Sequence, residues 1–334
     1  MAKTGKSNTL TDVRGILVGH FTDIRAVSGV TVVVCPQGAV AGVDVRGSAP
    51  GTRETDLMAP HNLIEKAQAV VLSGGSVFGL SAADGVTRWL AAKGYGFPLD
   101  QVHVVPIVPA AVLYDLGRGA DFTPPINADW GRKACEGAGD SPVQTGNVGA
   151  GTGAFSHSIK GGLGSASLIL DSGITVAALV AVNSDGSVIN PASGRPWEIG
   201  LEVDGEFGDQ GKRAVQLPAP PAPEPVKNTT IGVIATDASL EVAQAQKVAQ
   251  MAHDGMARAI RPAHTMFDGD TVFCLATGKK ELPAKQGIFM APRALSFNEL
   301  GHAAANCMAR AIIHAILNAS SLAGMTAFRD LKDL

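Results

Sequence analysis

The 334 residues are 46% hydrophobic and 17% charged, which is enough apolar material for one large core or two smaller ones. The net charge of −3, with both signs scattered, excludes the basic surface that nucleic-acid binding needs. The apolar runs are too short to cross a bilayer, and the first residues lack the apolar core of a signal peptide, which predicts a cytoplasmic protein that binds no membrane. The four cysteines are widely separated and predict reduced thiols, and we expect no metal and no cofactor.

Turns and short strands alternate through the first part of the chain. The runs 29–35 and 39–47 are rich in β-branched residues and are separated by a short turn, which predicts an antiparallel hairpin. The polar loop 49–56 carries a cluster of paired charges. It is either a solvated turn or a loop at the mouth of a pocket.

A glycine turn joins a predicted strand to a predicted helix. Strand 69–72 ends in the glycine turn 73–79, and apolar residues at helical spacing predict a helix over 79–93. A strand, a glycine turn and a helix could cradle a phosphate, but the sequence lacks the nucleotide-binding glycine patterns. Close packing of the helix on the sheet is the stronger interpretation. A further strand is predicted over 102–108.

Three polar residues stand out in the middle of the chain. Tyr114, one of only two tyrosines, follows the predicted strand 102–108. Lys160 lies among seven glycines, either in solvent or as a cation beside a ligand. Asn183 ends the predicted buried strand 174–182, where an asparagine is either a turn residue or an amide donor to an oxyanion.

The proline-rich run 217–225 predicts an exposed, extended tether, because proline fixes φ and lacks a backbone donor. The apolar run 230–236 then predicts a buried strand, so Asn228-Thr229 lies where the tether meets the core. We hypothesise that the chain cuts itself there. The Thr229 hydroxyl would attack the Asn228 carbonyl, and water would open the resulting ester. The new α-amine of Thr229, with a pKa of about 8, could then act as the base for its own hydroxyl. The alternative is an ordinary linker before a strand.

Two helices and one strand are predicted in the last hundred residues. Apolar residues at helical spacing predict helices over 240–260 and 298–318, and strand 271–276 lies between them. Asp268 and Asp270 lie on a glycine turn just before that strand. Two buried carboxylates need partners, so they form either a solvated turn or a pair that orients and polarises a nucleophile.

These pieces, taken in order, resemble one family. It comprises the self-processing, DmpA-like hydrolases, which include an L-aminopeptidase/D-Ala-esterase/amidase, the β-peptidyl aminopeptidases and the nylon-oligomer endo-hydrolase. The resemblance covers nearly the whole chain, from Asn8 to about Leu317. Its most specific pieces are 228–230, 74–79 and 267–270.

The resemblance implies an α/β fold, namely a four-layer α/β/β/α sandwich similar to that of the N-terminal-nucleophile hydrolases. It implies a single hydrolase domain, 1–334, that is self-cleaved into 1–228 and 229–334, and a homo-oligomer, typically a tetramer. The aminopeptidases of the family carry a serine nucleophile, with a serine and a glutamate in the later turn. The nylon-oligomer hydrolase carries a threonine and two aspartates. The intervals here, 268 − 229 = 39 and 270 − 229 = 41, agree with that second group.

The implied mechanism makes Thr229 the nucleophile that attacks an amide of a small peptide or a 6-aminohexanoate-type oligomer. Asp268 and Asp270 would hold its free amine. Asn183 and backbone N–H groups of a glycine turn would stabilise the oxyanion.

Four further residues complete the implied site. Tyr114 would position or protonate the leaving group. Lys160 would influence Thr229 during self-cleavage. Afterwards it would lower the pKa of the Thr229 α-amine. Gly75 and Ser76 are predicted to bind the substrate.

Three alternatives stay open. An exo-acting aminopeptidase would need a carboxylate, such as Glu54 or Asp56, to hold the substrate ammonium. An acetyltransferase of the ornithine acetyltransferase type would use an acceptor amine in place of water. A non-enzymatic ligand-binding module would keep an uncut chain and lose nothing on Thr229→Ala.

Overall fold

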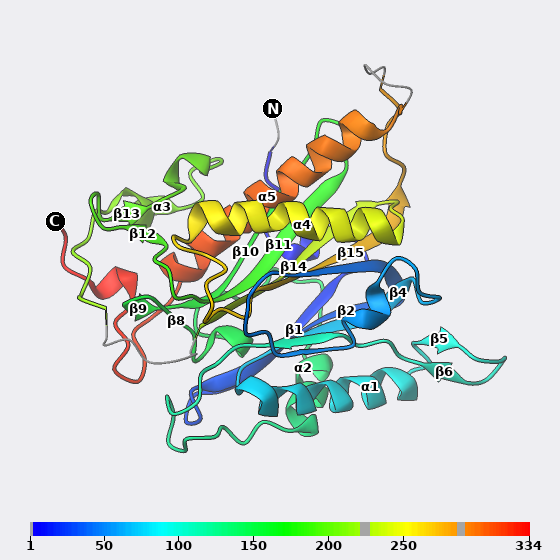
Figure 1. The fold of residues 1–334 in the computed structure, drawn as a ribbon, viewed down its shortest axis with the longest axis horizontal. Helices are drawn as coiled ribbons and strands as arrows, with labels where there is room; N and C mark the ends of the chain where they lie inside the picture. The colour runs from blue at the N-terminus through cyan, green and yellow to red at the C-terminus, as the bar shows by residue number, and fades with distance from the viewer. Residues whose placement is uncertain (1–2, 221–227, 286–290) are drawn as a thin grey trace.

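The computed structural model describes residues 3–220, 228–285 and 291–334, which form four layers (Figure 1). Helices α4 (Val242–Ala259) and α5 (Ala294–Leu317) lie on one side of the molecule, at the top of the view. Helices α1 (Ala82–Ala92) and α2 (Ala128–Glu136) lie on the other. Strands fill the space between these helix layers.

The strands between the helices form one mixed sheet with the order β10-β11-β14-β15-β2-β4-β7-β3, in which β1 also pairs with β2. Its members are β1 (Leu17–Asp23), β2 (Ser28–Val45), β3 (Thr52–Arg53), β4 (Lys66–Ser73), β7 (Ala110–Val112), β10 (Gly162–Ile169), β11 (Thr175–Asn183), β14 (Thr229–Ala238) and β15 (Thr271–Lys280). Shorter pairs lie outside it: β5 (Phe97–Pro98) with β6 (Val104–Val105), β8 (Phe155–Ser156) with β9 (Ile159–Lys160), and β12 (Ile189–Asn190) with β13 (Arg195–Pro196). A short helix, α3 (Gly208–Lys212), follows β13.

Strand β2 joins the two halves of this sheet. Its residues 28–34 lie between β1 and β4, and its residues 40–45 pair with β15. The register to β4 shifts around Gly38, which has a φ of +71°, so the turn residues form a bulge. The predicted hairpin is therefore wrong, because these residues bend one continuous strand and do not reverse it.

Side chains alternate between apolar layers along the strands. In β11 the even-numbered residues of 176–182 pack with α4 and α5, and the odd-numbered residues of 177–181 face the centre of the molecule. In β2 Val33 belongs to the same central layer, whereas Val30 and Val32 pack with α1 and α2. The central layer holds no residue of these four helices, so two strand layers pack face to face there. The predicted α/β/β/α sandwich is confirmed.

The predicted helices are all present. The first is a 3-10 turn (Ser76–Ser81) that continues into α1, and the other two are α4 and α5. The strand predicted over 102–108 is wrong: only Val104–Val105 pair, and Val102 is 82% exposed. Pro106, which cannot donate a backbone hydrogen bond, explains the short pairing. The predicted tether lies partly outside the described residues.

Strand β14 brings the predicted site residues to one end of the sheet. It runs antiparallel to β11 and parallel to β15, and α4 connects it to β15. Its first residue, Thr229, pairs with Asn183, the last residue of β11. The turn before β15 carries Asp268 and Asp270. No helix in the described ranges is long and apolar enough to span a membrane.

Candidate active site

Thr229 is buried, with 5% of its surface exposed. Its hydroxyl donates a hydrogen bond to the carbonyl oxygen of Asn228, the residue before it. The backbone N–H of Gly269 donates to the same oxygen at 3.3 Å. The hydroxyl therefore lies against a peptide bond that a backbone donor polarises.

Gly269 lies so close to Thr229 that a side chain at this position has no space. A Cβ at this position would lie 2.9 Å from Thr229 Oγ1 and 2.7 Å from the carbonyl oxygen of Ala49. The loop that contains Ala49 is itself bonded to the carboxylate turn, because the Ala49 N–H donates to the Asp268 carbonyl at 2.9 Å. The loop 49–56 thus begins against the candidate site.

The carboxylates of Asp268 and Asp270 are almost fully buried, with 1% and 2% of their residues' surface exposed. Asp270 Oδ1 accepts a hydrogen bond at 2.7 Å from the N–H of Thr230, the residue after Thr229. Asp268 Oδ1 accepts from the N–H of Asp185 at 3.4 Å. Their other oxygens are bonded to residues 264–265. Burial, with the charge of Asp270 adding to it, raises the pKa of Asp268.

The Asn183 side chain is oriented by two donors. Its Oδ1 accepts from the Arg118 guanidinium at 2.6 Å and from the Phe155 N–H at 3.0 Å. Because one end of the amide accepts both bonds, the other end is the NH2 group, which can only donate. Since Asn183 pairs with Thr229 across the strands, this donor suits an oxyanion that forms on the Thr229 side.

Arg118 and Asp115 were missed by the sequence reasoning. Asp115 is buried and accepts from the Ser28 hydroxyl and the Gly75 N–H, both at 2.6 Å. Burial raises the pKa of Asp115, and it lowers the pKa of Arg118 to about 10. The available signal was the two opposite charges within four residues after Tyr114, where an apolar run ends.

The turn 74–76, where substrate binding was predicted, has its backbone donors in use. Its three N–H groups donate to acceptors in the protein, namely Gly29 O, Asp115 Oδ1 and Leu113 O. Gly75 and Ser76 have φ values of +80° and +51°, so the turn is held in the left-handed region. The Ser76 side chain and the shape of the turn remain as its means of contacting a ligand.

Lys160 is fully buried beneath the glycine loops. Its Nζ donates to the carbonyl oxygens of Gly151, Ala154 and Gly161 at 3.0, 2.9 and 2.8 Å. Burial, reinforced by the charge of Arg118, lowers the pKa of Lys160 to about 7. The ammonium group of Lys160 therefore holds three loop carbonyls in place. One of them belongs to Ala154, which directly precedes Phe155, whose N–H donates to Asn183.

We expect Lys160→Met to destabilise the fold, because each buried carbonyl that loses its donor costs about 1–3 kcal/mol. The pH dependence should change too. The folded state releases the Lys160 proton near pH 7, whereas the unfolded chain holds it to about pH 10. The unfolding free energy should therefore rise between these pH values, and this rise should vanish in the variant.

Denaturant unfolding at pH 7 and 9, in a Thr229→Ala background that keeps one chain, measures both effects on Lys160→Met. Lys247→Met on the exposed face of α4 is the control. Equal unfolding free energies and equal pH slopes for the two methionine variants would contradict this role of Lys160.

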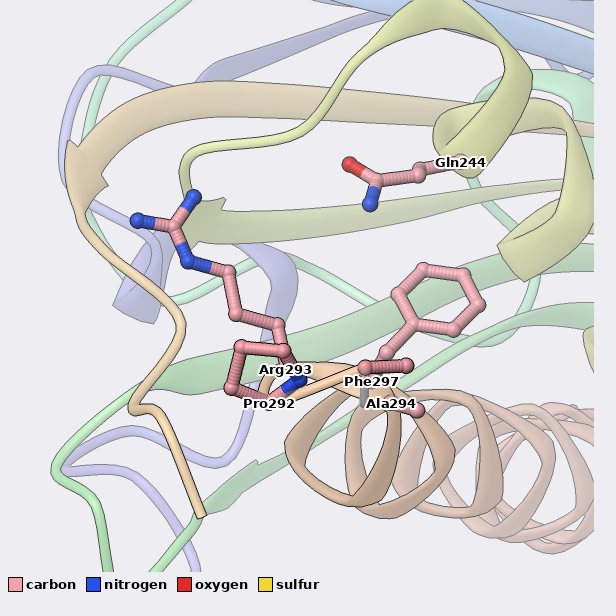
Figure 2. Close-up of a pocket in the computed structure, with 6 residues that line it drawn as sticks. Gln244, Pro292, Arg293, Ala294 and Phe297 are labelled. Atoms are coloured by element: carbon pink, nitrogen blue, oxygen red, sulfur yellow. The ribbon is translucent and has the colours of Figure 1, made fainter. Parts of the chain in front are cut away.

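A surface pocket of about 350 Å³ lies at the N-terminal ends of α4 and α5 (Figure 2). Its lining residues are Gln244, Ala291, Pro292, Arg293, Ala294 and Phe297. Helix α4 begins just after the end of β14, so the pocket lies at the opposite end of that strand from Thr229. Ten strand residues span about 33 Å. This pocket is therefore not part of the candidate active site.

Within the described part of the chain, no three His, Cys, Asp or Glu side chains are grouped so that they could hold a metal ion. The four cysteines are buried and unpaired.

Comparison with known proteins identifies the family. The model of peptidase family S58 matches residues 8–329. The chain belongs to peptidase family S58. A Mycobacterium tuberculosis protein named uncharacterized aminopeptidase is 46% identical to this S58 peptidase, over 97% of this chain and 98% of its own. The 6-aminohexanoate-oligomer endohydrolase of Kocuria sp. is 29% identical, over 93% of this chain and 87% of its own.

A solved structure supports the fold. The L-aminopeptidase D-Ala-esterase/amidase of Ochrobactrum anthropi, described as a variant of the Ntn hydrolase fold, superposes with a TM-score of 0.72 over 98% of this chain and 90% of its own, at 24% identity. The predicted family resemblance is confirmed, and this S58 peptidase is an amide hydrolase. Hydrolysis is thereby favoured over the acetyl-transfer and ligand-binding alternatives.

Proposed function

We propose that this S58 peptidase cuts its own Asn228–Thr229 bond and then hydrolyses amide bonds of small peptides or 6-aminohexanoate-type oligomers. Thr229 would serve as the N-terminal nucleophile. One observation carries the proposal: the buried Thr229 hydroxyl lies against the Asn228 carbonyl, whose oxygen also accepts from Gly269. The named relatives, an aminopeptidase and an oligoamide hydrolase, support the amide substrate.

Self-cleavage begins with attack of Thr229 Oγ1 on the Asn228 carbonyl carbon. The C–N bond breaks, and the nitrogen gains the proton that the hydroxyl loses. Water then opens the ester, which leaves a carboxylate on Asn228 and restores the hydroxyl of Thr229. The products, 1–228 and 229–334, stay in one fold because β14 lies between β11 and β15 in the sheet.

In the processed enzyme the α-amine of Thr229 takes the hydroxyl proton during attack on a substrate carbonyl. Asp268 and Asp270 hold this amine, and the Asn183 amide donates to the oxyanion, which is worth about 3 kcal/mol of barrier. The amine then returns the proton to the leaving group, and water releases the acyl group.

Tyr114 and Lys160 have supporting roles in this proposal. Tyr114 positions or protonates the leaving group, and no hydrogen bond within residues 3–220, 228–285 and 291–334 uses its hydroxyl. Lys160 holds the loops behind Asn183 and adds positive charge near the site, which disfavours a second cation on the amine.

The mass of the denatured protein tests self-cleavage. Two fragments should appear whose masses add up to the 34.1 kDa chain plus one water, and the smaller one should begin at Thr229. A single uncut chain in a preparation that hydrolyses amides would overturn the proposal.

Exo action as an aminopeptidase is a second candidate, favoured by the 46% identity to a relative of that name. Glu54, one carboxylate considered for the substrate ammonium, accepts from the Val108 N–H at 3.0 Å. Comparing free-amine and N-acetylated peptides decides between exo and endo action. We further propose a cytoplasmic homotetramer of cleaved chains, as the resemblance implies.

A further inference from the structure

Two consecutive residues, His264 and Thr265, each give two hydrogen bonds to one of the carboxylates. The His264 N–H and ring Nδ1 lie 3.1 and 2.7 Å from Asp270 Oδ2. The Thr265 N–H and Oγ1 lie 2.9 and 2.7 Å from Asp268 Oδ2. Each carboxylate is thus held through a single oxygen by one main-chain and one side-chain donor.

The backbone of His264 is unusual. Its φ is +57°, in the left-handed region that residues other than glycine seldom adopt, although asparagine, aspartate and histidine are enriched there among them. Such a conformation persists where the surrounding contacts require it. Here it allows the N–H and the ring of one residue to reach the same oxygen of Asp270.

The ring of His264 also packs against a second histidine ring. It packs edge to face against His253, with the ring centroids 4.8 Å apart. His253 is fully buried, and its Nε2 donates to the Asp44 carbonyl at 3.0 Å. His253 therefore packs against the His264 ring, while Nδ1 of that ring donates to Asp270.

The other oxygen of each carboxylate accepts a backbone hydrogen bond at the end of the sheet where β14 begins. Asp270 Oδ1 accepts from the N–H of Thr230, the residue after Thr229. Asp268 Oδ1 accepts from the N–H of Asp185 at 3.4 Å, and the backbone of Asp268 forms a parallel bridge with Asn228, the residue before Thr229. Because Oδ2 is anchored in each case, the orientation of Oδ1 is fixed before any substrate binds.

We propose that His264 and Thr265 are positioning residues, which hold Asp270 and Asp268 so that both carboxylates are aimed at the amine of Thr229. The inference rests on the proposed role of that amine. The two residues act through the carboxylates and do not bind the substrate. Their loss should therefore lower kcat and leave KM unchanged.

Two matched pairs of variants test this inference. His264→Asn keeps a side-chain donor and tolerates the left-handed backbone, whereas His264→Gly tolerates that backbone without the donor. Thr265→Ser keeps the hydroxyl, and Thr265→Val removes it at similar volume. We expect the glycine and valine variants to lose about 10- to 100-fold in kcat at constant KM. The asparagine and serine variants should retain most of the activity.

Melting temperature and the extent of self-cleavage are measured on every variant. Slower self-cleavage in the glycine and valine variants than in their partners would also support the inference. Equal kcat within each pair would overturn it. If His264→Gly does not fold, Thr265→Val carries the test, because it removes a single hydroxyl.

Thr229→Ala, assayed in parallel, separates this inference from the proposed function. If Thr229→Ala is inactive while His264→Gly and Thr265→Val are fully active, only the positioning role is ruled out. If Thr229→Ala is active, the proposed function is ruled out as well.

Discussion

Replacing Thr229 with alanine should leave the chain uncut and reduce amide hydrolysis by about 10⁶-fold, the loss that removal of a nucleophile produces in other acyl-transfer enzymes. Both steps need the same hydroxyl, which is buried against the Asn228 carbonyl. Thr229→Ser should still cut itself and hydrolyse substrate. Thr229→Val, which keeps the branched shape at the start of β14, should behave as the alanine variant does.

The neighbouring residue supplies the control for this experiment. Thr230 is also buried, but its hydroxyl has no hydrogen-bond partner among the described residues. Thr230→Val therefore removes a buried hydroxyl one residue away without breaking a bond, and it should be cut and active. Mass spectrometry and an amide-hydrolysis assay on the five proteins, wild type included, measure both steps. Hydrolysis by uncut Thr229→Val would show that another group is the nucleophile.

The sequence indicated the position of Thr229 because boundaries between segments can be read from composition. A proline-rich run followed by an apolar strand placed Thr229 at the edge of the core, and the glycine turn before the next strand placed Asp268 and Asp270. The parallel pairing of β14 with β15 then brings these positions together. Local patterns located these positions because both strands begin there, and the family resemblance selected them over an ordinary linker and a solvated turn.

The donors around these residues were not predictable in the same way. Arg118 and Asn183 are 65 residues apart, and no periodicity links them. A left-handed backbone at His264 leaves no mark in composition, because most histidines still have a negative φ. The bulge at Gly38 has the same turn residues as a hairpin, so only the pairing with β4 distinguishes a bend from a reversal. In all three cases the conformation depends on contacts that the local sequence pattern does not specify.

Asn183→Asp should lower kcat for amide hydrolysis by about 10²- to 10³-fold while the fold stays intact. The aspartate still offers an oxygen to Arg118 and Phe155, so the two bonds that orient Asn183 are kept. The change replaces the NH2 group with a second oxygen. A carboxylate there donates nothing to an oxyanion and repels its charge.

The two steps should respond differently to Asn183→Asp. In self-cleavage the Gly269 N–H already donates to the Asn228 oxygen, so the chain should still cut itself, although more slowly. Asn183→Ala is the matched comparison: it loses the same donor but also removes the acceptor of the Phe155 N–H and one of the two acceptors of Arg118, so its melting temperature should fall. Rates of both steps and melting temperatures on wild type, Asn183→Asp and Asn183→Ala separate catalysis from stability. Full hydrolytic activity of Asn183→Asp would mean that the oxyanion forms on another face of Thr229, where backbone donors alone must stabilise it.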